Sequence, residues 1–155
     1  MRGPITSTRM PDIFHNLFIH APIEEVYHSI SDPEELDQWW TKRSSGKPEH
    51  GAVYTLFFGP KHDWRAVVTL AEPGKAFEIQ INHADSHPAW VGTRIGFVLY
   101  QESRSLTEVE FYHIGWPAVT ENFRVSSYCW AMYLRILKRW LEVGELIPYE
   151  ERLKV

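Results

Sequence analysis

Residues 119–143 read VTENFRVSSYCWAMYLRILKRWLEV and decide the fold, because they form the longest helix-like segment of the chain. Spacings of four and three residues alternate along one stripe, which contains Phe123, Ser127, Trp130, Leu134, Leu137 and Leu141. Such spacing predicts an amphipathic helix whose stripe packs on a core. Gly144 follows directly and is a typical helix stop. The segment therefore predicts one long helix that can cover a sheet.

Upstream of this helix, runs with apolar alternation predict six strands. They cover residues 13–19, 52–58, 64–70, 76–82, 91–100 and 106–114. Phe77, Ile79 and Ile81 alternate with polar residues and should face inward. Short turns such as Glu72-Pro73-Gly74-Lys75 join consecutive strands, which favours an antiparallel sheet.

Two short helices are predicted between the first and second strands. Pro22 suits a first helical position, and the residues from Ile23 to Ile30 follow helical spacing. Asp32 is a good N-cap for a second helix, with Pro33 at its first position and Glu35 completing a box-like pattern. That helix ends in Trp39-Trp40, and a polar loop follows before residue 52. The order is strand, two helices, five strands and long helix, which is an α+β architecture.

Composition bounds the class of protein. The chain has 155 residues, 8 Phe, 7 Tyr and 7 Trp, so 22 aromatic rings are available to a core. Its net charge of −4 lacks the basic excess of nucleic-acid binding proteins. The only cysteine, Cys129, can form neither an internal disulfide nor a thiolate zinc cluster. No apolar run approaches the length of a membrane span, and no secretory leader pattern is visible. We expect a cytoplasmic protein with residues 1–12 as a flexible lead-in and residues 13–155 as a single domain.

Three stretches resemble a known family. They are residues 19–27 running into 32–36 and Trp39-Trp40, residues 92–95 and 109–116, and Trp130, Leu134, Leu137 and 142–144 on the long helix. Their order resembles the START-like, helix-grip superfamily (SRPBCC), specifically the domain of activators of Hsp90 ATPase and their bacterial homologues. The resemblance implies a curved six-stranded sheet wrapped around the C-terminal helix, with a deep pocket between them. It implies no shared catalytic residues and no cofactor.

The predicted pocket suggests that the protein binds a small apolar or aromatic ligand without catalysis. Aromatic walls would supply stacking and dispersion, and few polar groups would orient the ligand. The predicted ligand-binding residues are Trp40, Trp64, Ile79, Ile81, Ile95, Phe97, Phe111, His113, Trp116, Phe123, Ser127 and Trp130. In this reading, His113 would hydrogen-bond a carbonyl or hydroxyl of the ligand. Ser127, small and polar between rings, would leave room for it.

Other interpretations stay open for individual residues. His113 can instead be a buried imidazole satisfied by a backbone carbonyl, or a catalytic base, although no orienting acid is evident. Of the Trp39-Trp40 pair, one ring can fill the core while the other lies at the surface or closes the pocket. His83, Asp85 and His87 form an H-x-D-x-H triplet that binds a metal only if it lies in a strand, and its neighbours favour a solvated loop. Cys129 lacks a basic neighbour and reads as an inert thiol.

Two alternative functions remain. The family resemblance allows an interaction module that stimulates a chaperone ATPase of the Hsp90 type, although the eukaryotic co-chaperones carry a further domain. Some superfamily branches are polyketide cyclases, which need a polar pair facing the cavity, and here only His113 is a candidate. No nucleic-acid partner is expected, and either a monomer or a homodimer is compatible with the sequence.

Overall fold

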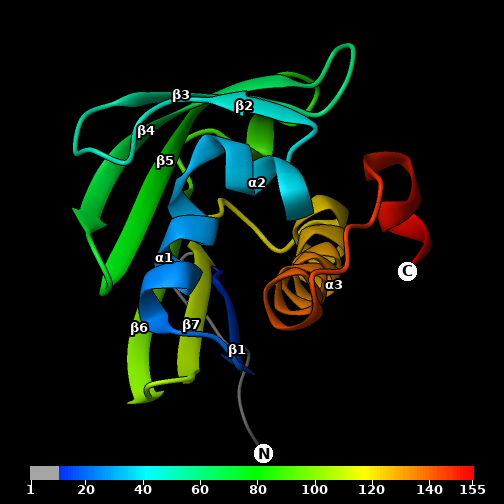
Figure 1. Ribbon diagram of the computed structural model, residues 1–155. Helices are drawn as coiled ribbons and strands as arrows, with labels where there is room; N and C mark the ends of the chain where they lie inside the picture. Colours follow the sequence, from blue (N-terminus) through cyan, green and yellow to red (C-terminus); the bar gives the residue numbers. More distant parts are fainter. Residues whose placement is uncertain (1–10) are drawn as a thin grey trace, which may run out of the picture.

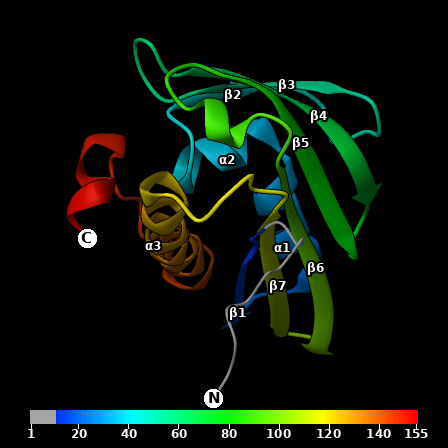
Figure 2. The same ribbon diagram turned by 180° about the vertical axis from the view of Figure 1, so that it is seen from behind.

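A computed structural model describes residues 11–155, and its centre is one antiparallel sheet curved around a long helix. The strands are β1 (Ile13–Ile19), β2 (Arg43–Ser45), β3 (Val53–Phe57), β4 (Asp63–Glu72), β5 (Ala76–Ala84), β6 (Arg94–Ser103) and β7 (Leu106–Ile114). Their order across the sheet is β1-β7-β6-β5-β4-β3-β2. The helix α3 (Glu121–Val143) lies in the hollow of the sheet in both views (Figure 1, Figure 2). The predicted α+β helix-grip fold is confirmed.

The strand alternation predicted from the sequence sets the core. Phe77 on β5 pairs with Phe97 on β6, and Phe97 pairs with Phe111 on β7, so a row of rings crosses the concave face. All three side chains are buried. Because inward positions alternate with outward ones, this register places the apolar side chains of adjacent strands on the face that meets α3.

The sheet has seven strands rather than the six predicted, because β2 lies within the segment predicted to be a polar loop. Arg43–Ser45 pairs with β3, and Ser45 Oγ and Thr55 Oγ1 are 2.6 Å apart across that pair. Ser44 Oγ is within hydrogen-bond distance of both the Pro33 carbonyl and Asp37 Oδ1. Polar contacts hold this strand, so it lacks the apolar alternation by which a strand is recognised in a sequence.

The two short helices are α1 (Ile23–Ser31) and α2 (Pro33–Trp39). As predicted, Asp32 caps α2, and its side chain accepts from the Glu34 N–H at 2.9 Å. Glu35 does not complete the predicted box. Its Oε1 instead accepts from Ser29 Oγ of α1 at 2.8 Å and from Trp140 Nε1 of α3 at 3.1 Å. One carboxylate thereby joins all three helices.

The helix α3 begins after Thr120, whose side chain accepts from the Phe123 N–H, and ends at Gly144 with a left-handed φ of 67°. Its buried face contains Ser126, Trp130, Leu134, Ile136 and Leu137. Ser127, which the sequence predicts on this stripe, lies at its edge. Ser126, four residues before Trp130, is the buried serine, while Ser127 is half-buried and its carbonyl lies 3.2 Å from His15 Nε2.

Most of the predicted lead-in, residues 1–12, lies outside the described residues, and its flexibility stays a prediction. Within the described part, Asp12 Oδ1 accepts from the Gly115 N–H at 3.0 Å. Within residues 11–155, no helix combines the length and the apolar character needed to cross a bilayer. After α3, the chain continues into a 3₁₀ segment, η2 (Tyr149–Lys154), which lies beside α3 (Figure 1).

Candidate functional site

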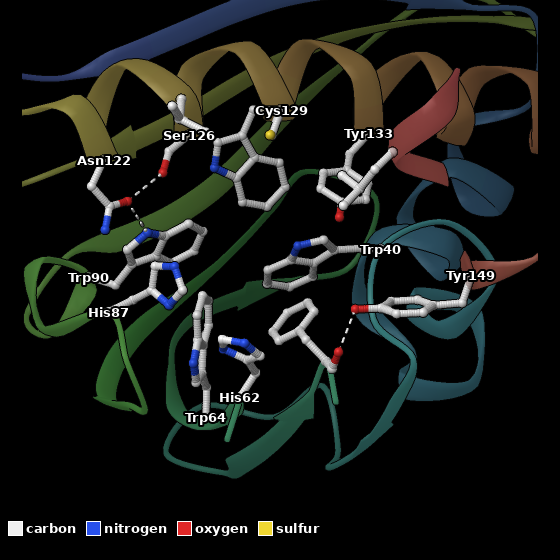
Figure 3. A pocket seen from close by; sticks show the side chains of 14 residues that line it. Trp40, His62, Trp64, His87, Trp90, Asn122, Ser126, Cys129, Tyr133 and Tyr149 are labelled. Atoms are coloured by element: carbon white, nitrogen blue, oxygen red, sulfur yellow. Dashed lines mark hydrogen bonds between the residues drawn. The ribbon is translucent and has the colours of Figure 1, made fainter. Parts of the chain in front are cut away.

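A cavity of about 450 Å³ opens between the first half of α3, the loops at one end of the sheet, and η2 (Figure 3). This volume lies in the range of pockets for small organic ligands. The lining residues are Trp40, Phe58, His62, Trp64, His87, Trp90, Asn122, Val125, Ser126, Cys129, Trp130, Tyr133, Tyr149 and Leu153. They come from the end of α2, the β3–β4 connection and the start of β4, the β5–β6 connection, α3 and η2.

The walls of the cavity are a connected set of aromatic rings. Trp40 lies 5.0 Å from Trp130 and 5.4 Å from Phe58, measured between ring centroids. Trp64 lies 4.8 Å from Phe58 and 4.6 Å from Trp90. Among these lining residues there is no Asp, Glu, Lys or Arg, so the cavity offers no fixed charge to an ionised ligand. An uncharged, ring-containing molecule therefore suits these walls.

The C-terminal segment η2 forms one wall and is held by a buried arginine. Arg152 is 3% exposed and donates to the carbonyls of Ile147, Thr41 and Asp37. Asp37 lies near the C-terminus of α2, where unpaired helix carbonyls favour a cation. Tyr149 adds a second tie, because its hydroxyl donates to the Phe58 carbonyl at 2.7 Å. These contacts place Tyr149 and Leu153 against the cavity.

Several polar groups of the cavity wall are already paired within the protein. Asn122 Oδ1 lies 3.4 Å from Trp90 Nε1 and 3.2 Å from Ser126 Oγ, which are both donors to it (Figure 3). Trp64 Nε1 donates to the Asp85 carbonyl at 3.1 Å. Burial raises the pKa of the Cys129 thiol, so this side chain stays protonated near neutral pH and is a poor nucleophile.

The structure divides the twelve predicted ligand-binding residues into two groups. Trp40, Trp64 and Trp130 line the cavity. The remaining residues do not line it: Ile79, Ile81, Ile95, Phe97, Phe111, His113, Trp116, Phe123 and Ser127. Most of these nine are buried in the core, and Phe123 is partly buried against it. The side chains at the centre of the concave face are buried beneath α3, and the cavity lies toward the β3–β4 end of the sheet.

His113 was predicted to bind a ligand, but both of its ring nitrogens have protein partners. Trp130 Nε1 donates to His113 Nδ1 at 3.0 Å, and because an indole N–H can only donate, the proton of the neutral ring sits on Nε2. Nε2 then donates to Thr93 Oγ1 at 2.8 Å. Burial lowers the pKa of His113 to about 3, which keeps the ring neutral. His113 is a satisfied core residue, held by side chains rather than by a backbone carbonyl.

Trp39 and Trp40 lie in different environments, in agreement with the interpretation that one ring fills the core while the other closes the pocket. Trp39 is fully buried, and its Nε1 donates to the Ser29 carbonyl at 2.9 Å. Trp40 stacks on Trp39 with a centroid distance of 6.2 Å and turns its other side to the cavity.

The segment around the H-x-D-x-H triplet contributes to the cavity in a way that the sequence did not indicate. His83 Nε2 and Asp85 Oδ1 are 2.8 Å apart on an exposed surface, while His87 lines the cavity, 5.4 Å from the Trp64 ring. The three side chains do not converge, and the described residues contain no group of three or more such ligands placed to hold a metal. Trp90, on the 3₁₀ turn η1 (Pro88–Trp90), supplies the adjoining wall.

Other cavity residues were missed because their signals are weak in a sequence. Phe58 and His62 lie at or beyond the end of a strand, and Tyr149 and Leu153 follow the last helix without periodic pattern. One stripe of α3 faces the cavity, and it contains Asn122, Ser126, Cys129 and Tyr133. That stripe has spacings of four, three and four, which is the signal that could have identified it.

Comparison with solved structures places this geometry among known proteins. The Aha1 dimer from Colwellia psychrerythraea is similar at 31% identity and a TM-score of 0.77, covering 88% of this chain and 99% of that one. BH1534 from Bacillus halodurans is 24% identical with a TM-score of 0.70, covering 88% and 100%. DynU16, a protein of the dynemicin biosynthetic locus, is 19% identical with a TM-score of 0.70, covering 88% and 50%. The latter two show the fold alone.

No curated protein matches the chain. The sequence model described as Activator of Hsp90 ATPase homolog 1-like protein matches residues 20–142. This match covers both short helices, most of the sheet and nearly all of α3. The family anticipated from the motifs at residues 19–40, 92–116 and 130–144 is thus confirmed, and the chain belongs to the Activator of Hsp90 ATPase homolog 1-like family.

Proposed function

We propose that this protein binds a small, uncharged, largely aromatic ligand in the cavity beside α3. The observation that carries the proposal is the lining itself, in which seven aromatic side chains from five separate parts of the chain surround about 450 Å³ without a carboxylate, ammonium or guanidinium group. A preformed apolar cavity of this kind gains dispersion contacts when an apolar molecule enters it. Burying a charged molecule there would be costly, because nothing in the wall compensates the charge.

Calorimetric titration with fluorene, a neutral planar hydrocarbon, tests this function. We expect saturable binding of one molecule per chain with a negative heat-capacity change, which is the mark of apolar burial. In a Cys129→Trp variant, the new ring should fill the cavity and abolish binding. Tyr128→Trp is the matched control, because Tyr128 is the next residue on α3 and is 78% exposed.

Circular dichroism shows whether each variant is folded, and a Val125→Trp variant at the cavity rim replaces Cys129→Trp if that protein misfolds. Absence of saturable fluorene binding to the wild type contradicts the proposal. Unchanged binding to a folded cavity-blocking variant contradicts it as well.

A second function is favoured by the similarity to Aha1 from Colwellia psychrerythraea and by the family itself. We propose, as the alternative, that the chain stimulates the ATPase of an Hsp90-type chaperone. Adding the purified protein to a bacterial chaperone of this type should then raise the rate of ATP hydrolysis in a concentration-dependent manner. A rate that stays at its basal value over a saturating range of concentrations would rule this alternative out.

A further inference from the structure

Hydrogen bonding of the tryptophans singles out one position in the cavity. The chain has seven tryptophans, and six of the indole N–H groups donate to a protein acceptor: those of Trp39, Trp64, Trp90, Trp116, Trp130 and Trp140. Within residues 11–155, Trp40 Nε1 has no such acceptor, although the side chain is only 4% exposed. Among residues 11–155, the buried side-chain atom without a partner is the Tyr27 hydroxyl, so Trp40 Nε1 is accessible from the cavity and free to donate to a ligand.

A second donor lies on the same part of the wall. Tyr133 of α3 lines the cavity, and its hydroxyl has no hydrogen-bond partner among the described residues. Both rings pack against Trp130, with centroid distances of 5.0 Å for Trp40 and 6.2 Å for Tyr133. In Figure 3 the Tyr133 hydroxyl and the nitrogen of Trp40 both point into the space enclosed by the labelled side chains.

The protonation states of the two groups make both of them donors. An indole N–H donates only, and it does not titrate in the physiological range. Burial is the main cause that raises the pKa of Tyr133 to about 12, so its hydroxyl keeps the proton near neutral pH. Because neither Lys nor Arg lines the cavity, the acceptor that best complements these donors is a neutral oxygen rather than a carboxylate.

We propose that Trp40 and Tyr133 form a two-donor site for the carbonyl oxygen of a neutral, planar aromatic ligand. This inference rests on the proposed ligand-binding function and names the chemical class of the ligand. A carbonyl oxygen has two lone pairs and can accept both hydrogen bonds, while the rings of the cavity contact the remainder of the molecule. Aryl ketones and quinones have this combination of a flat apolar body and an uncharged acceptor.

Comparing 9-fluorenone with fluorene tests the donor site, because the two molecules differ in a carbonyl against a methylene group. The carbonyl should strengthen binding about tenfold, given that a neutral hydrogen bond is worth roughly two- to tenfold in affinity. Tyr133→Phe removes one donor and keeps the ring, so it should weaken fluorenone binding about threefold relative to fluorene binding. Trp40→Phe should reduce the preference for fluorenone in the same way.

Tyr128→Phe is the matched control, since this tyrosine lies on the solvent side of α3 and should alter neither affinity. A carbonyl ¹³C label in fluorenone adds a direct readout. In the bound state its resonance should lie further downfield in the wild type than in Tyr133→Phe, because a hydrogen bond to the oxygen deshields the carbonyl carbon.

The outcomes separate the two proposals. If fluorene and fluorenone bind equally well and Tyr133→Phe changes neither, the donor site is overturned while the ligand-binding function stands. If neither molecule binds, both proposals fall. A preference for fluorenone that falls about threefold in Tyr133→Phe, together with the difference in the ¹³C resonance, supports both.

Discussion

The packed core beneath α3 and the cavity beside η2 are both built from aromatic side chains, but the side chains of the core fill the space between them and those of the cavity do not. Beneath the centre of α3, Phe97, Phe111 and His113 pack on Trp130 and Trp116, and the imidazole has partners for both nitrogens. Toward the C-terminal segment, Trp40 and Tyr133 face open space, and their donors lack protein acceptors within the described residues. A surplus of rings therefore does not by itself mark a pocket. Donors that face open space distinguish the cavity from the core, and the lack of a partner alone does not, because the Tyr27 hydroxyl is buried in the core and also has no partner within residues 11–155.

The largest effect should come from truncating the packed region. Phe111 is 1% exposed, and its ring lies 4.6 Å from Trp130 and 5.3 Å from Phe97. Phe111→Ala should lower the free energy of unfolding by about 3–5 kcal/mol, through lost burial and an unfilled hole. Urea denaturation measures this change. A loss below about 1 kcal/mol would show that the region tolerates holes and is not close-packed.

The second-largest loss of stability is expected from replacing His113. Replacing it by Phe leaves the Trp130 N–H without an acceptor, which should cost about 2 kcal/mol at pH 7, as is typical of an orphaned buried donor. Retention of full stability would indicate that the Thr93–His113–Trp130 chain of hydrogen bonds contributes nothing.

The same residue should make stability depend on pH. His113 has a folded pKa of about 3, whereas an unfolded histidine titrates near pH 6.5. Between these pH values, the histidine of the unfolded chain binds a proton, whereas His113 of the folded chain stays neutral. The free energy of unfolding therefore falls as the pH drops from 7 to 5. His113→Phe lacks this loss, and its stability gap to the wild type should narrow at pH 5. A gap of constant size in urea denaturation at both pH values would contradict the neutral, buried state of the ring.

The smallest effect on the free energy of unfolding is expected from a substitution that loosens η2, the segment that forms one wall of the cavity. Arg152→Met removes the guanidinium that holds η2 to the Asp37 and Thr41 carbonyls. Because a terminal segment can open locally, we expect a loss of only about 1 kcal/mol in unfolding free energy. Amide hydrogen exchange in residues 149–154 should nevertheless rise clearly, and fluorene affinity should fall. Unchanged exchange in that segment would mean that other contacts anchor it.

Much of the fold could be predicted from the sequence, because its signals are periodic. The alternation of Phe77, Ile79 and Ile81 and the Asp32 cap are local patterns with direct physical causes. The strand β2 was missed because serine hydroxyls rather than apolar burial hold it in place.

Prediction of the site was less complete. The sequence predicts Trp40, Trp64 and Trp130 at the cavity, but it also predicts residues from the centre of the sheet, which do not line it. Whether inward side chains touch α3 or leave space beneath it depends on the three-dimensional separation of helix and sheet, which periodicity does not encode. The wall supplied by Tyr149 and Leu153 depends on Arg152, whose partners are backbone carbonyls and leave no pattern in the sequence.

The most direct test of the contrast between cavity and core is the response of the individual indole N–H resonances to fluorene. In a two-dimensional ¹⁵N–¹H spectrum, we predict that the Nε1 signals of the cavity residues Trp40, Trp64 and Trp90 shift progressively as fluorene is added. Those of Trp39 and Trp116, fully buried and paired with backbone carbonyls, should stay in place. Shifts confined to Trp39 and Trp116, or no shift at any tryptophan at saturating fluorene, would contradict the account.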